Sequence, residues 1–113
     1  TTSAMVERSS DKLIFSANSG LTANTPFTPN NIMTVYGTNS NVGIGTTTPV
    51  ASAKLEVSST TSGFLPPRMT ATQASAISTP AQGLLLFVTD TDGTFTSVGW
   101  WGYNGATWEK LNN

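Results

Sequence analysis

The chain of 113 residues contains no cysteine and no histidine. Without cysteine no disulfide can form, and without either residue type the usual ligands of zinc, copper and iron are missing. A serine nucleophile would also lack the histidine that normally acts as its base. We therefore expect no metal site, no cofactor and no enzymatic activity.

Charge is scarce as well. Charged residues make up 10% of the chain, against about 25% in an average soluble domain. The net charge of -1 provides no basic patch to neutralise phosphates, so nucleic acid is not an expected partner. The longest apolar run, residues 84–88, fits one buried strand and is far shorter than the roughly 18 residues of a membrane span. We expect no membrane insertion.

The six carboxylates form no recognisable catalytic pattern. Glycoside cleavage needs two carboxylates about 5 to 10 Å apart, and a pair formed across a subunit boundary would make the chain a polysaccharide depolymerase, the least favoured alternative. Asp90-x-Asp92-Gly93 resembles the start of a calcium loop, but the later ligands of such a loop are missing. These residues are more typical of a turn.

Residues 1–45 contain short β segments between polar turns. Two apolar runs, residues 12–15 and 32–36, are predicted strands, and each would bury little surface by itself. This pattern favours a shaft in which three chains supply one another's missing core. Gly43 and Gly45 lack the third glycine of a dinucleotide-binding loop, and Pro49 follows where its helix would begin. The two glycines therefore indicate a tight turn in a β-stalk.

The next part of the chain contains the one predicted helix. Residues 53–57 alternate between apolar and polar types and predict a strand. Thr70 and Gln73 have the spacing of a capping box, in which the threonine begins a helix. We expect a short helix near residues 70–77 that ends before Pro80.

The C-terminal part predicts three antiparallel strands, at residues 83–89, 94–103 and 106–111. Asn104-Gly105 is typical of a two-residue hairpin turn. If the loop consists of only these two residues, Tyr103 pairs with Ala106 across the hairpin. Trp101 then pairs with Trp108, and Trp100 pairs with Glu109.

The period of two in a strand divides the aromatic residues between two faces. Trp101, Tyr103 and Trp108 share one face and are expected in the core or at a trimer interface. Trp100 lies on the other face and is the candidate exposed ring, because exposed aromatic rings can stack on sugars. We therefore predict a receptor or glycan site at Trp100 and Glu109, with Asp92 and Asn104 in nearby turns.

Three segments, Asn41–Pro49, Ala53–Val57 and Gly63–Thr70, are followed by two more at residues 83–91 and 103–111. Together the first three resemble a module that recurs in phage tail fibres, viral spike or fibre proteins, and surface proteins of Bacteroidetes-type bacteria, and the last two resemble the small head that usually follows it. The resemblance implies a homotrimeric β-fibre with a distal head on a virion or cell surface.

The predicted fold is all-β, with a short-stranded shaft at residues 1–45 and a small antiparallel β head with one helix at residues 46–113, in an intertwined homotrimer. The predicted function is non-enzymatic attachment by a viral or phage fibre or spike at the virion surface. The expected partners are two further copies, other virion proteins and a host cell-surface receptor or glycan. The alternatives are a bacterial surface or secreted adhesin or carbohydrate-binding module, and a purely structural virion spacer.

Overall fold

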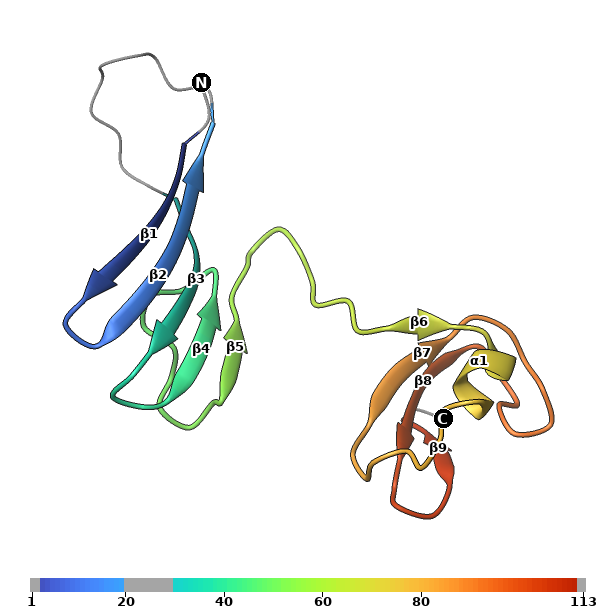
Figure 1. Ribbon diagram of the computed structural model, residues 1–113. Coiled ribbons are helices and arrows are strands. Elements are labelled where there is room, and N and C mark those ends of the chain that lie inside the picture. Colours follow the sequence, from blue (N-terminus) through green and yellow to red (C-terminus); the bar gives the residue numbers. More distant parts are fainter. Residues whose placement is uncertain (1–2, 20–29, 112–113) are drawn as a thin grey trace. The chain divides into compact units, whose positions relative to one another are not determined.

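The computed structural model describes residues 3–19 and 30–111. The chain divides into two compact units, Thr1–Gly63 and Phe64–Asn113, and each is built on its own β-sheet (Figure 1). Among the described residues, β-strands are the main secondary structure of both units, and one short helix accompanies them. The prediction of a β-rich fold with a single short helix is confirmed.

The first unit is one five-stranded sheet in the order β1-β2-β3-β4-β5. Neighbouring strands are antiparallel from β1 to β4, and β5 lies parallel to β4. The strands are β1 (Ser3–Ser9), β2 (Lys12–Asn18), β3 (Asn30–Tyr36), β4 (Asn41–Ile44) and β5 (Leu55–Val57). The first sheet therefore continues to Val57. The division into a shaft of residues 1–45 and a head of residues 46–113 stays a prediction about the fibre.

Residues 45–54 form the connection between β4 and β5, and this connection covers part of one face of the sheet. The Asn41 side chain donates hydrogen bonds of 3.1 Å to the carbonyl groups of Val50 and Ala53. A Cβ atom on Gly43 would lie 2.7 Å from the Thr46 carbonyl oxygen, and one on Gly45 would collide with the carbonyl of Ser58. Gly45 also has a φ of 73°, which favours glycine. The two glycines therefore serve close backbone packing.

The second unit is a four-stranded sheet in the order β6-β7-β8-β9, with α1 against one of its faces (Figure 1). The β6 strand is parallel to β7, and the other pairs are antiparallel. The elements are β6 (Arg68–Met69), α1 (Ala71–Ser75), β7 (Leu85–Val88), β8 (Gly99–Tyr103) and β9 (Trp108–Lys110).

The helix begins as its sequence predicts. The Thr70 hydroxyl accepts a hydrogen bond from the Gln73 backbone, and the Gln73 side chain accepts one from the Thr70 backbone, which is a complete capping box. Asp90 accepts a further bond of 2.6 Å from the Ala71 N–H. The helix ends at Ser75, two residues earlier than expected, with Ala76 as its C-cap.

The helix and the sheet enclose a hydrophobic core in the second unit. Phe95 and Val88 are fully buried, and the cluster consists of Ala71, Ala74, Leu86, Val88, Phe95 and Trp101, with Met69, Ile77 and Trp108 packed against it. In the described part of the first unit, by contrast, Ile14 is the one large apolar side chain that is buried. The two units therefore differ in how they bury apolar surface.

Candidate functional site

The β8–β9 hairpin carries most of the predicted site, and its loop is longer than expected. Tyr103 pairs with Trp108, so residues 104–107 form a four-residue loop. The predicted pairing of Tyr103 with Ala106 is wrong, and the pairings inferred from it shift by two residues. Glu109 consequently lies opposite Gly102 and not opposite Trp100. A shift of two residues leaves every side chain on its predicted face.

The Asn104 side chain explains the longer loop. Its Oδ1 accepts hydrogen bonds of 2.8 Å from the backbone N–H groups of both Ala106 and Thr107. Asparagine often stabilises a turn in this way, by bonding the backbone two or three residues ahead. The Asn104 N–H also donates to the Thr107 carbonyl at 3.1 Å, which closes the loop.

The same asparagine holds Glu109. Asn104 Nδ2 donates a hydrogen bond of 2.7 Å to Glu109 Oε1. Within the described residues, the second carboxylate oxygen of Glu109 has no hydrogen-bond partner. Both side chains are exposed. The pair therefore presents a fixed carboxylate with one oxygen ready to accept a hydrogen bond.

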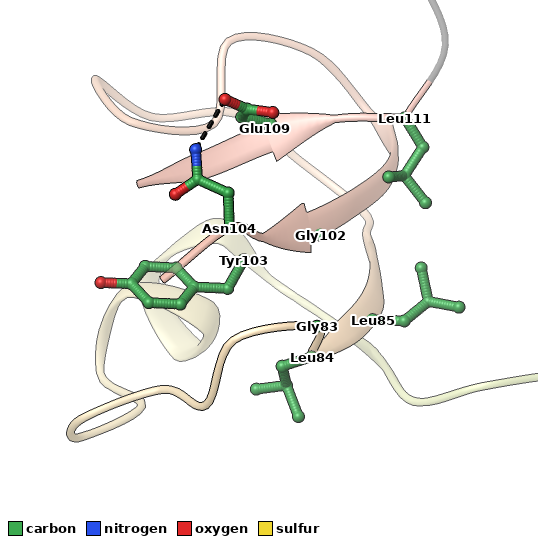
Figure 2. Close-up of a pocket in the computed structure, with 8 residues that line it drawn as sticks. All are labelled: Gly83, Leu84, Leu85, Gly102, Tyr103, Asn104, Glu109 and Leu111. Atoms are coloured by element: carbon green, nitrogen blue, oxygen red, sulfur yellow. Dashed lines mark hydrogen bonds between the residues drawn. The ribbon is translucent and has the colours of Figure 1, made fainter. Parts of the chain in front are cut away.

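The Asn104–Glu109 pair forms one end of a pocket of about 310 Å³. Gly102 lies between this polar end and a group of leucines (Figure 2). A Cβ atom on Gly102 would lie 3.1 Å from Leu111 Cδ2, so glycine leaves room for the hollow. The lining residues are Gly83, Leu84, Leu85, Gly102, Tyr103, Asn104, Glu109 and Leu111. The pocket is thus apolar with one polar end.

On the opposite face, Trp101 belongs to the core, Trp108 packs against that core, and Tyr103 contacts Trp108. Phe95 packs edge-on against Trp101 with ring centroids 5.2 Å apart, and it also contacts Trp108 at 5.4 Å. Tyr103 packs against Trp108 at 5.3 Å. The Trp101 indole donates to the Ser97 carbonyl at 3.1 Å, which satisfies its buried N–H. Trp101 is 5% exposed, whereas Tyr103 and Trp108 are half-buried.

Trp100 lies outside the pocket. It points to the face opposite Trp101, and its ring packs edge-on against Phe87 with the centroids 5.1 Å apart. Trp100 is half-buried. Its backbone carbonyl accepts a hydrogen bond from the Leu111 N–H. Trp100 and Glu109 therefore share a face of the sheet, but they are not opposite one another.

Asp92 supports the turn that precedes β8. Its carboxylate accepts 2.7 Å bonds from the N–H groups of Phe95 and Thr94, and a 3.2 Å bond from the Ser75 hydroxyl. The Phe95 N–H, followed by the Thr94 N–H and the Ser75 hydroxyl, keeps the pKa of Asp92 below its ordinary value, against the opposing effect of partial desolvation. Asp92 thus binds two backbone N–H groups in the structure, and Asp90 binds one.

The structure brings two of the four predicted site residues together. Asn104 and Glu109 meet at the pocket, whereas Trp100 and Asp92 do not line it. The leucines and Gly102 were not predicted from the sequence, because their role in the pocket depends on the pairing of three strands. The alternation of Trp100 and Gly102 in β8 with Asn104, which follows the strand, is the signal that could have placed Gly102 on this face.

In the described parts of the chain, no three histidine, cysteine, aspartate or glutamate side chains gather closely enough to hold a metal ion. No described helix has the length and apolar character needed to cross a membrane.

Comparison with known proteins places most of the chain in a single family. The family model described as "Phage tail like trimerisation region" matches residues 43–113, which is more than half of the chain. No curated protein and no solved structure matches the sequence. The matched region contains the end of β4, all of β5 and the whole second unit. The chain therefore belongs to the phage tail-like trimerisation regions, a structural family of self-associating modules that is not in itself enzymatic.

Proposed function

We propose that the chain is one subunit of a homotrimeric fibre or spike module at a virion surface, and that its second unit attaches the particle to a host-surface glycan. The family match supports a phage-tail structural module that self-associates. The pocket between Glu109 and Leu85 is the observation that carries the attachment function.

The chemistry of the pocket fits a neutral sugar. The carboxylate of Glu109 can accept hydrogen bonds from sugar hydroxyl groups, and Asn104 fixes its orientation through the 2.7 Å bond. The side chains of Leu85 and Leu111 offer an apolar surface to the C–H groups of the ring. Small-molecule sites commonly combine such an apolar lining with a few well-placed polar groups.

A trimer would present three such pockets. Each single site of this size gives weak binding, but a fibre that carries three sites can bind a glycan-covered surface with high avidity. A stiff, multivalent module of this kind suits attachment without catalysis.

The leucines also favour a second candidate function, that of a structural spacer in the virion. Leu85 is 39% exposed and Leu111 is 57% exposed. In this alternative, a neighbouring copy or another virion protein covers the two leucines, and the pocket has no sugar ligand. Glycan binding distinguishes the two candidates.

The test begins with the mass of the wild-type protein by light scattering, followed by binding to a glycan array and to host cells. We expect three times the 11.8 kDa chain mass. Glu109→Gln should weaken glycan binding roughly tenfold or more, because it removes a charged acceptor. Glu7→Gln makes the same chemical change on exposed β1 and should have no effect. A wild-type trimer that binds no glycan and no cells would support the spacer instead.

A further inference from the structure

The first sheet has one face that is apolar across all five strands. Residues directly opposite in neighbouring strands lie on the same face. One such row runs Val6, Phe15, Met33, Ile44 and Val57, with one residue from each strand. The next row on this face runs Arg8, Leu13, Val35, Val42 and Leu55. We call these two rows the apolar face, and Arg8 is its single charged member.

The opposite face is polar, and it is the more deeply buried of the two. The row between the two apolar rows runs Glu7, Ile14, Thr34, Gly43 and Glu56. Thr34 is 0% exposed, and neighbouring Asn41 is 1% exposed, where residues 45–54 cover this side. On the apolar face, Val6 is 64% exposed and Leu55 is 54% exposed.

This burial pattern is the inverse of that in a sheet that folds alone. An open antiparallel sheet normally covers its apolar face and leaves its polar face to solvent. Contiguous apolar patches larger than a few hundred Å² are rare on monomeric proteins and generally mark an interaction surface. The apolar face therefore needs an apolar partner of similar extent.

We propose that the apolar face is the contact between the three copies of this chain, with the rows from each copy directed toward the other two. This inference rests on the trimer in the proposed function and adds the surface that forms it in the first unit. The matched trimerisation region includes Ile44, Leu55 and Val57, which lie at one end of the two rows. The same rows continue through β3, β2 and β1, outside that region, with Arg8 as the one charged position.

The composition of the face supports a second copy as its occupant. With one charge among its ten positions, the face offers little to a charged or strongly polar partner. Facing sheets pack about 10 Å apart when their side chains interdigitate, and mixed aliphatic and aromatic side chains suit such packing. Self-association is the interaction that the family match indicates, and the copies bring identical apolar faces to it.

The absence of cysteine permits a clean test on the full chain. Val6 and Met5 are adjacent on β1, point to opposite faces, and are both exposed, at 64% and 39%. Val6→Cys and Met5→Cys therefore form a matched pair of single thiols. Phe15→Cys, on β2, adds a second position on the apolar face. The measurement is the rate of alkylation of each thiol, with the mass of every sample determined by light scattering.

We expect the thiols at positions 6 and 15 to react at least tenfold more slowly than the thiol at position 5 in a trimeric sample. Full reactivity at positions 6 and 15 in a sample of trimeric mass would overturn this inference and leave the proposed trimer intact. A monomeric mass for the unmodified protein would overturn the trimer itself. Protection that disappears when the protein is unfolded in denaturant confirms that the thiols are covered and not chemically blocked.

Discussion

The two units of this chain differ in where they place their apolar side chains. The second unit buries Phe95, Trp101 and Leu86 between its sheet and α1, so its core lies within one chain. The first unit directs Val6, Leu55 and other apolar residues outward and buries Thr34 instead. From this difference we expect the second unit to keep its fold as a single chain and the first unit to depend on assembly.

The unpaired polar atoms of the first unit support this view. Among the described residues, Thr34 Oγ1 and Asn41 Oδ1 are buried without a hydrogen-bond partner. Each such atom costs about 1 to 3 kcal/mol in stability. The sheet therefore gains little from its covered face, and we expect the contact between copies to provide most of its stability.

The largest expected effect comes from breaking the core of the second unit. Phe95→Ala removes a fully buried ring that contacts two tryptophans, and it should destabilise that unit by about 3 to 5 kcal/mol. All three tryptophans lie in the second unit, so tryptophan fluorescence during denaturant unfolding follows this unit alone. The matched control is Phe64→Ala, because Phe64 is 65% exposed. Equal losses in both variants would contradict the assigned core.

The second effect, slightly smaller, comes from the apolar face of the first unit. Phe15→Glu places a charge among apolar side chains and should weaken the trimer by roughly 2 kcal/mol or more per chain. The measurement is the dependence of mass on protein concentration. Met5→Glu introduces the same charge on the opposite face as a control.

The same Phe15→Glu variant also tests whether the second unit folds independently of the first. Its tryptophan fluorescence should be nearly unchanged, because the second unit keeps its own core. If Phe15→Glu dissociated the trimer and also abolished the unfolding transition seen by tryptophan fluorescence, the two units would not fold independently.

The sequence predicts best those features that depend on residues close together in the chain. The capping box of Thr70 and Gln73 involves residues three apart, and it formed as predicted. The division of Trp100 from Trp101 follows from the strand period and is also correct. The hairpin pairing was wrong because the Asn104 side chain competes for the backbone N–H groups of the turn.

Two features lay beyond local signals. The pocket depends on three strands that place Leu85, Gly102 and Glu109 side by side. Residues 45–54 determine which face of the first sheet is covered. The alternation of side chains along a strand identifies the two faces, but it does not predict which of them is buried. Both the pocket and the covered face depend on contacts between residues that are distant in the sequence.

The third effect comes from the helix that covers the second sheet. Thr70→Ala removes the side-chain half of the capping box and should cost the second unit about 1 kcal/mol. Thr72→Ala, at an exposed position within the same helix, should change the stability by less than about 0.5 kcal/mol. Fluorescence-detected unfolding of both variants tests this, and similar losses would show that the cap contributes nothing specific.

The smallest expected effect is on the stability of the second unit at acidic pH. Because hydrogen bonds from Phe95, Thr94 and Ser75 lower the pKa of folded Asp92, its carboxylate contributes stability at pH values above the unfolded pKa. That contribution is lost as the pH falls below the ordinary aspartate pKa of about 3.9 and through the lowered value of the folded state. We expect Asp92→Asn to destabilise the second unit slightly at neutral pH and to flatten its stability profile below about pH 4.

Asp11 provides the matched control for this prediction in the first unit. Its pKa is lowered as well, chiefly by the hydrogen bond from the Thr38 hydroxyl, in opposition to partial desolvation. Asp11→Asn should therefore alter the acid dependence of the first unit and leave the tryptophan signal of the second unit unchanged. If Asp11→Asn and Asp92→Asn changed the fluorescence-detected acid transition equally, the two units would share one cooperative transition, and the contrast between a self-sufficient unit and an assembly-dependent one would fail.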